Sequence, residues 1–312
     1  QWIKEGTVCI ITLWNGVPLT VTPPAHVELT ITETDPGARG ATVTGVDLSG
    51  TLDAATIRIL RTAWMEHHVL AFPGQTLSDA DLERIVQYFG VFGAEPYFMP
   101  IPGSEHVVAL TRKADEKAPL FAENWHSDWS FLEEPPIGTC LYSLVIPPVG
   151  GETGFTNQQK ALAEMPPALR ARLDGRIALH SAGAAYAPDG MYGARDKAAG
   201  RSMAIRFSDD AREVRGHPFI ARHPESGRET LLGCLGYIMG VAGMDDSEAF
   251  ELLLELHAWQ TREEFQYTHK WQQNMFVIWD NRSVLHRAYG GYDGYDRVLH
   301  RITVAGDPAK FL

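Results

Sequence analysis

Hydrophobic residues recur at helical spacing in two neighbouring segments near the start of the chain. The pattern predicts a helix over residues 53–68 and a second over residues 78–90, with Ser78 placed to cap the second. Between them, Val69–Phe72 is a short apolar run that ends at the turn Pro73-Gly74, which is typical of a buried strand. The faces that would pack inward are Ile57, Leu60 and Trp64 in the first helix and Leu82, Ile85, Val86 and Phe89 in the second.

A third helix is predicted over residues 245–262, close to the other end of the chain. Its apolar face is expected to contain Phe250, Leu253, Leu254 and His257.

The remaining apolar runs are short, rich in β-branched or aromatic residues, and bounded by turns, so they are predicted strands. No glycine-rich phosphate loop follows any of them, which disfavours a doubly wound sheet. The pattern predicts a mainly β fold with flanking helices, a sandwich or jelly roll. The predicted strands lie in residues 106–111, 139–146, 176–182, 230–234, 275–280 and 297–305.

Composition is that of an ordinary globular protein. The 312 residues are 45% hydrophobic and 21% charged, and nothing in the sequence divides them, so we expect one domain over residues 27–312 after an N-terminal extension, residues 1–26. The formal net charge of −12 lacks the basic excess that nucleic-acid binding requires. Nucleic acid is therefore not an expected partner.

Three cysteines, Cys9, Cys140 and Cys234, are too few and too widely spaced to indicate a disulfide framework or a thiolate zinc site. A reducing compartment, the cytoplasm, fits this usage. No apolar run reaches the length of a membrane span, and the opening residues lack the pattern of a signal peptide, so no membrane association is expected.

The segment ENWHSDWSF contains a His-x-Asp pair, His126 and Asp128. On an extended chain, residues two apart face the same side, so imidazole and carboxylate could meet at one metal ion. His286, just beyond a predicted strand, could complete the two-histidine, one-carboxylate set of non-haem Fe(II) oxygenases. Such a pair also arises by chance, and a single histidine is more often structural, so this pattern alone leaves both interpretations open.

The predicted strand RVLHRITVA places Arg297 and Arg301 on one face, about 13 Å apart for a rise of about 3.3 Å per residue. If that face is buried, each guanidinium requires an anion, and its planar fork matches a carboxylate. If the strand lies at an edge, both arginines could simply be solvated. The two alternatives are about equally well supported by this segment alone.

Five segments in order, ENWHSDWSF, PPVGGETGF, HPESGRETLL, WDNRSVLHRA and DRVLHRITVAGD, resemble the taurine dioxygenase and 2,4-dichlorophenoxyacetate dioxygenase (TauD/TfdA) family. The resemblance runs from about Gly40 to Asp307 and includes the opening segments GATVTGVDLS and VLAFPGQTLS. An ordered set of this kind is much more specific than any one of its motifs.

The resemblance implies a double-stranded β-helix (jelly-roll) fold and dependence on Fe(II), 2-oxoglutarate and O2. By position in the motifs, His126, Asp128 and His286 would bind the iron, which would also make them the catalytic centre. Thr153 and Arg297 would hold the far carboxylate of 2-oxoglutarate. Arg301 would hold the acidic group of a small anionic substrate, and the enzyme would be a homo-oligomer, as family members often are. Tyr97, in the turn after the second predicted helix, is expected to reach the substrate.

The substrate is left open among members of one chemical class. A run resembling the phenoxyacetate-degrading branch favours an aryloxyalkanoate, and the alternatives are taurine or another alkylsulfonate, and an alkyl sulfate. The Gly- and Ala-rich residues 181–203 are expected to form a mobile loop near the substrate. Two other functions remain as rivals: a zinc hydrolase, although no His-Glu-x-x-His motif is present, and a non-catalytic metal-binding sensor.

Overall fold

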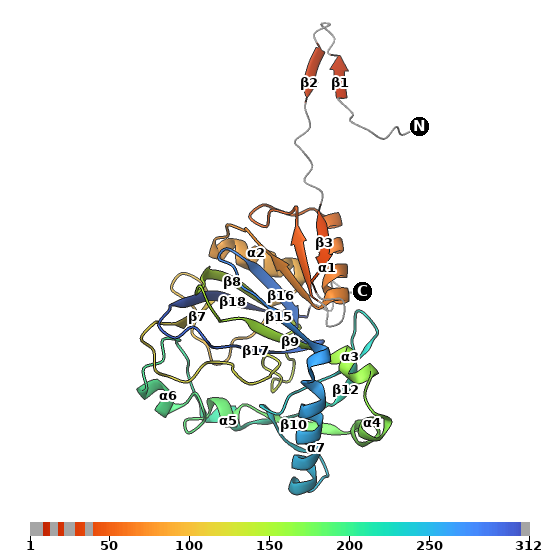
Figure 1. Cartoon of the computed structure of the whole chain (residues 1–312), viewed down its shortest axis with the longest axis vertical. Coiled ribbons are helices and arrows are strands. Elements are labelled where there is room, and N and C mark those ends of the chain that lie inside the picture. The colour runs from red at the N-terminus through yellow and green to blue at the C-terminus, as the bar shows by residue number, and fades with distance from the viewer. Residues whose placement is uncertain (1–8, 13–17, 22–28, 35–39, 307–312) are drawn as a thin grey trace.

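The computed structural model describes residues 9–12, 18–21, 29–34 and 40–306. Its largest element is an eight-stranded, mostly antiparallel sheet in the order β3-β4-β5-β16-β8-β18-β6, with β7 paired to β18 (Figure 1). These strands are β3 (Thr30–Glu33), β4 (Ala41–Thr44), β5 (Val69–Phe72), β6 (Val91–Phe92), β7 (Val108–Arg112), β8 (Gly138–Val145), β16 (Phe276–Asp280) and β18 (Arg297–Ala305).

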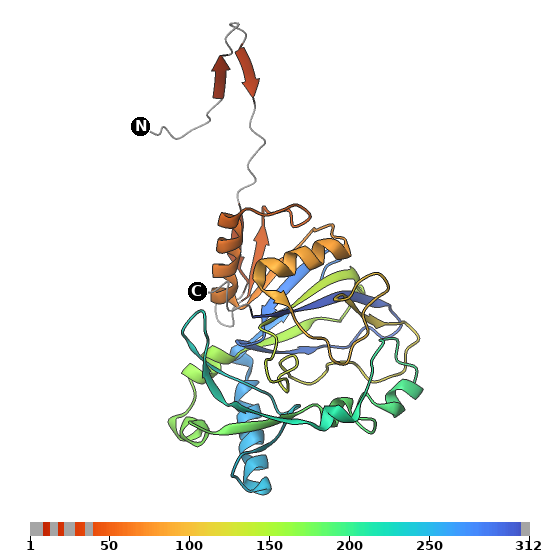
Figure 2. The same cartoon turned by 180° about the vertical axis from the view of Figure 1, so that it is seen from behind.

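A second sheet faces the first and has the order β15-β9-β17. It consists of β9 (Thr153–Asn157), β15 (Gln266–His269) and β17 (Val284–Ala288). Apolar side chains from both sheets fill the space between them, among them Leu141 and Leu299 of the large sheet and Phe155 and Val284 of the small one. The two facing sheets, seen from behind in Figure 2, are the layered β core that the sequence predicts.

Helices α1 (Ala54–His67) and α2 (Asp79–Phe89) cover the other face of the large sheet, as Figure 1 shows. Ser78 caps α2 in a capping box with Asp81, and the predicted face of that helix is buried. In α1, Leu60 and Trp64 are buried as predicted, whereas Ile57 is only partly buried. Both helices therefore shield the sheet from solvent and leave its inner face for the site.

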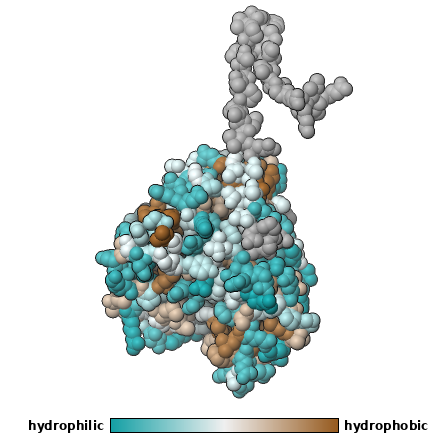
Figure 3. Space-filling view, in the orientation of Figure 1, coloured by the Kyte–Doolittle hydropathy of each residue, from teal (hydrophilic) through white to brown (hydrophobic). Residues whose placement is uncertain are grey.

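The predicted buried face of α7 (Asp246–Gln260) is only partly right. Leu253 is buried as predicted, but Phe250 and Leu254 are 58% and 44% exposed, and Leu252 and Leu256 are buried in their place. The helix is apolar on two sides, so periodicity could not decide which side packs against the protein. In Figure 3 the surface is hydrophilic over most of the visible face, and a brown area lies at its lower end, over α7.

No helix among the described residues is long and apolar enough to cross a membrane. Short α-helices and two 3-10 helices join the strands: α3 (Gln158–Ala163), α4 (Pro167–Leu173), α5 (Gly183–Tyr186), α6 (Ala194–Ala198), η1 (Asp209–Arg212) and η2 (Glu263–Phe265). Smaller ladders are formed by β1 (Cys9–Thr12) with β2 (Pro18–Val21), by β10 (Ile177–Ser181) with β11 (Val214–Pro218) and β14 (Ile238–Val241), and by β12 (Ile220–Arg222) with β13 (Glu229–Leu231).

Candidate metal and cosubstrate site

His126 and His286 are brought together by the backbone. The two residues form an isolated antiparallel bridge, in which each amide N–H donates to the carbonyl of the other, at 2.9 and 2.7 Å. Asp128 follows in a turn, not in a regular strand, and Trp129 after it has a positive φ of 50°. The convergence predicted for His126 and Asp128 is present, although the local conformation is tighter than an extended chain.

The three side chains surround one point. Ligand atoms of His126, Asp128 and His286 all lie within 4.8 Å of one another. Each histidine Nε2 is 3.6–3.8 Å from an Asp128 oxygen, which is too long for a hydrogen bond. Atoms bound to one metal ion at about 2.0–2.2 Å are separated by roughly 3 Å or more, so the geometry fits a shared cation.

Neighbouring groups prepare these side chains for a metal. His126 Nδ1 is 2.8 Å from the Asn124 carbonyl oxygen, which can only accept, so Nδ1 carries the proton and Nε2 has a free lone pair. Burial lowers the pKa of both histidines, that of His286 to about 3, which keeps the rings neutral. Burial alone would raise the pKa of Asp128, but the positive charge of Arg301 and the hydrogen bond from Thr139 hold it well below its usual value. The set is therefore two neutral imidazoles and one carboxylate.

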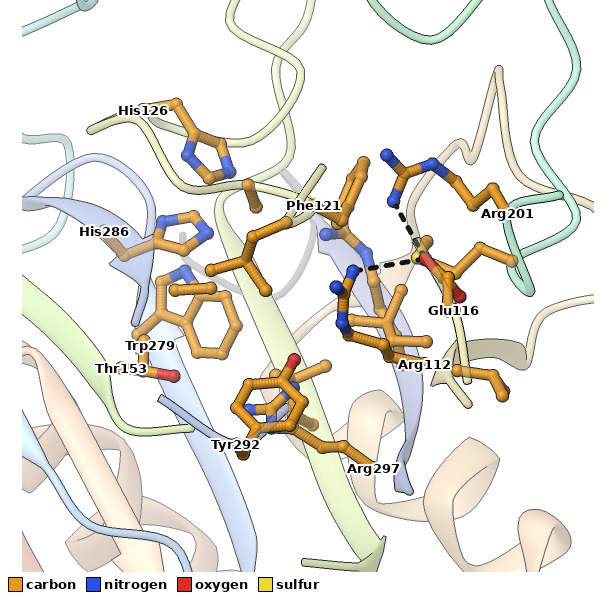
Figure 4. Close-up of a pocket in the computed structure, with 18 residues that line it drawn as sticks. Arg112, Glu116, Phe121, His126, Thr153, Arg201, Trp279, His286, Tyr292 and Arg297 are labelled. Atoms are coloured by element: carbon orange, nitrogen blue, oxygen red, sulfur yellow. Dashed lines mark hydrogen bonds and ion pairs between the residues drawn. The ribbon is translucent and has the colours of Figure 1, made fainter. Parts of the chain in front are cut away.

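A cavity next to the histidines is lined by Thr153 and Arg297 (Figure 4). Arg301 also lines it. Thr153 opens β9, and its Oγ1 accepts a hydrogen bond from Trp271 Nε1 at 2.9 Å. That bond leaves the hydroxyl hydrogen of Thr153 available to another acceptor. We call this space the main cavity.

Arg297 is buried without a carboxylate partner among the described residues. Its Nη2 donates to the Gly151 carbonyl at 3.2 Å, and its Nε has no partner. Gly151 has a positive φ of 75°, a backbone conformation that a residue with a side chain adopts only with strain. In this conformation the Gly151 carbonyl oxygen faces Arg297. Burial lowers the pKa of Arg297. An unpaired buried cation beside a candidate metal site is a strong indication of an anionic ligand.

The structure corrects the prediction that Arg301, if buried, requires an anion of its own. Its charge does not require an anion from outside, because Nε contacts Glu95 and Nη1 contacts Asp128, both at 3.0 Å. Two carboxylates thus already face this guanidinium, and Arg301 holds a candidate metal ligand in place. Nη2 of Arg301 has no partner among the described residues and is the one nitrogen left for a ligand.

Tyr97 is placed elsewhere. Its ring stacks on Tyr186 at 4.5 Å between centroids and packs against Trp129 and Phe131, and it does not line the main cavity. Glu95, two positions earlier in the same turn, is the side chain that contacts Arg301.

Residues 181–203 form a wall of the site. They include α5 and α6, and Arg201 lines the main cavity, where it contacts Glu116 (Figure 4). An adjoining cavity shares Phe121, Ala122 and His126 with the main one. Its other walls include Trp125, Tyr186, Met191, Tyr192 and Tyr237, and we call it the aromatic lobe.

Comparison with known proteins decides the family. Residues 30–303 match the model of the family described as "Taurine catabolism dioxygenase TauD, TfdA family". The chain belongs to the TauD/TfdA family.

Individual members of this family align over most of the chain. It is 32% identical to an alpha-ketoglutarate-dependent sulfate ester dioxygenase of Pseudomonas putida, over 87% of this chain and 88% of that protein. It is 31% identical to an (S)-phenoxypropionate/alpha-ketoglutarate-dioxygenase of Delftia acidovorans, over 90% and 97%. A putative alpha-ketoglutarate-dependent taurine dioxygenase from Burkholderia xenovorans superposes with a TM-score of 0.73 at 26% identity, over 90% and 93%.

Membership confirms the predicted jelly-roll fold and the enzyme class, a 2-oxoglutarate-dependent non-haem iron dioxygenase, with Fe(II), 2-oxoglutarate and O2 as its cofactor and cosubstrates. Four charged residues of the site belong to no recognisable motif, and of these only Glu95 lies in a turn that the sequence marks as a candidate. The other three are Arg112, Glu116 and Arg201.

Proposed function

We propose that His126, Asp128 and His286 bind Fe(II) and that the enzyme oxidises a C–H bond of a small organic anion. The observation that supports this most is the pair of neutral histidines around Asp128, next to an unpaired Arg297 in the same cavity. A hydrolytic zinc site would leave Arg297 without a function. A 2-oxoglutarate carboxylate gives it one.

Arg297 and Thr153 would hold the far carboxylate of 2-oxoglutarate. Both line the main cavity, and each has a donor free of other strong partners: Nε of Arg297 and the hydroxyl hydrogen of Thr153. A guanidinium fork and a hydroxyl together match the geometry of a carboxylate. Trp271 would act as a positioning residue, because its indole fixes the direction of the Thr153 hydroxyl.

When bound, the iron would activate O2 for decarboxylation of 2-oxoglutarate to succinate and CO2, with one oxygen atom passing to the substrate. The protein's own contribution is orientation. Asn124 fixes the ring of His126, while Arg301 and Thr139 each hold one oxygen of Asp128, at 3.0 and 2.7 Å. These contacts keep the ligands in place before any metal binds.

For the substrate, we favour an aryloxyalkanoate. The aromatic lobe is lined by aromatic and small side chains and suits an aryl ring, and Nη2 of Arg301 could donate to the acidic group. Hydroxylation of the carbon beside the ether oxygen would give a hemiacetal, which splits into a phenol and a keto or aldehyde acid.

A sulfate ester is the second candidate, supported by the sulfate ester dioxygenase of Pseudomonas putida among the relatives. Hydroxylation at the carbon that carries the ester oxygen would release sulfate and an aldehyde. Taurine is less well supported, because the described residues of the aromatic lobe include no carboxylate for its ammonium group.

Substrate-dependent succinate formation tests this proposal. Purified enzyme with Fe(II), ascorbate and 2-oxoglutarate is incubated with aryloxyacetates, aryloxypropionates, alkyl sulfates and alkylsulfonates. We expect succinate in proportion to phenol or sulfate released. Metal-dependent hydrolysis without 2-oxoglutarate would support the hydrolase, and metal binding without turnover of any compound would support the sensor.

Location in the cytoplasm and assembly into a homo-oligomer are also part of the proposal. Cys140 and Cys234 are buried and unpaired, which agrees with a reducing compartment. Assembly is supported by family resemblance, and light scattering of the purified protein would test it.

A further inference from the structure

Arg301 is enclosed on nearly all sides. Its Nε contacts Glu95 Oε1 and its Nη1 contacts Asp128 Oδ1, both at 3.0 Å. The rings of Phe98 and Trp129 lie over the guanidinium, each with its centroid 5.2 Å from Cζ. The group is held rigidly, and Nη2 is the nitrogen that remains without a partner among the described residues.

Glu95 is a fixed part of this arrangement. Its side chain is only 7% exposed, and its second oxygen accepts a hydrogen bond from Trp129 Nε1 at 3.0 Å. A carboxylate is rarely buried unless it is paired, and here the pair is made inside the site. Because Asp128 is assigned to the metal, Glu95 is the group that offsets the charge of Arg301.

The other arginines of the main cavity differ in whether a carboxylate balances their charge. Arg112 and Arg201 share Glu116, at 3.3 and 3.7 Å (Figure 4). Arg297 is the cavity arginine without a carboxylate partner in the described part of the chain, and it is assigned to 2-oxoglutarate. The guanidinium assigned to the primary substrate, that of Arg301, therefore already has a counter-ion, whereas the one assigned to 2-oxoglutarate has none.

We propose that Glu95 is a specificity-determining residue, a built-in counter-ion that limits how tightly Arg301 can bind an anionic head group. The inference rests on the proposed function. A substrate acid at Nη2 would approach a guanidinium that already carries the Glu95 carboxylate, so like charges would oppose much of the attraction. Substrates would then gain most of their affinity from an apolar body in the aromatic lobe, and short, fully ionised compounds would be rejected.

Phenoxyacetate and its methyl ester separate charge from shape. Their dissociation constants are measured from the change that each causes in the visible absorption of the anaerobic Fe(II)–2-oxoglutarate enzyme. In Glu95→Gln we expect phenoxyacetate to bind roughly ten-fold tighter or more, because one buried like charge is removed. The uncharged ester should change by less than about two-fold, since it meets no such repulsion.

Two control variants isolate the charge of Glu95. Glu95→Asp keeps the carboxylate and should show no gain for phenoxyacetate. Glu116→Gln removes a different buried carboxylate from the same cavity, one that serves other arginines, and should also show no gain. An equal gain in Glu116→Gln, or an equal gain for acid and ester in Glu95→Gln, would overturn the inference.

The unaltered enzyme gives a test that does not depend on a variant folding. If Glu95 offsets Arg301, the acid should bind no more than roughly ten-fold tighter than its ester; a preference of a hundred-fold or more would refute the role. Absence of the Fe(II)–2-oxoglutarate absorption in this enzyme would instead overturn the proposed function, and this inference with it.

Discussion

Replacement of Arg297 by Met tests the cosubstrate assignment most directly. A bidentate pair to a carboxylate contributes two charge-assisted hydrogen bonds of about 1.5–3 kcal/mol each. The lower end of that range applies, because Nη2 of Arg297 already donates to the Gly151 carbonyl in the unliganded protein and gains less from the ligand. We expect 2-oxoglutarate to bind about 3 kcal/mol more weakly, roughly a hundred-fold in Kd.

The assay is an anaerobic titration of the Fe(II) enzyme with 2-oxoglutarate, followed by the visible absorption of the complex. Arg112→Met is the matched control, because Arg112 is the cross-strand neighbour of Arg297 but already contacts Glu116 and the Ala118 carbonyl. Its Kd should change by less than about three-fold. An Arg297→Met titration that overlays the wild-type curve would refute the assignment.

Further expectations concern the metal, the positioning of Thr153 and the response to acid. Asp128→Ala should abolish metal-dependent turnover while the circular dichroism spectrum stays folded; retained activity would exclude it as a ligand. Trp271→Phe removes the donor to Thr153 and should raise the KM for 2-oxoglutarate about three- to ten-fold with kcat retained, as loss of about 1 kcal/mol predicts; an unchanged KM would argue against a positioning role. Burial lowers the pKa of His269 to about 4, so its contribution to stability is complete above about pH 6.5 and is lost as the pH falls towards 4. Urea unfolding of His269→Gln should then show about 3 kcal/mol less loss of stability over that pH range than wild type, and parallel curves would contradict this.

Much of the fold could be predicted because its elements carry redundant local signals. Helix α2 has a predicted cap at Ser78 and one predicted apolar face, and both agree with the structure. Helix α7 has apolar residues on two sides, so local periodicity could not identify the buried one, and Phe250 is exposed. Which side of α7 is buried depends on tertiary packing.

The candidate site, too, could be predicted only in part. Ligand types and their order are visible in the sequence, whereas the partner of a charged side chain is not. Arg301 shares a strand face with Arg297, yet the first contacts Glu95 and the second contacts only a backbone carbonyl. Glu95 lies far from Arg301 along the chain, and no spacing rule connects them.

The bridge between His126 and His286 has a consequence for how the protein folds. Ser127, between the first two candidate ligands, donates to the Asn281 carbonyl across 154 residues of sequence. Contacts of such high sequence separation form late, because closing the long intervening loop costs chain entropy before any contact repays it. A complete metal site therefore cannot exist in a nascent or half-folded chain. Metal binding would therefore be among the last steps of folding. The ion would bind fully folded molecules in preference to partly folded ones and would slow their unfolding.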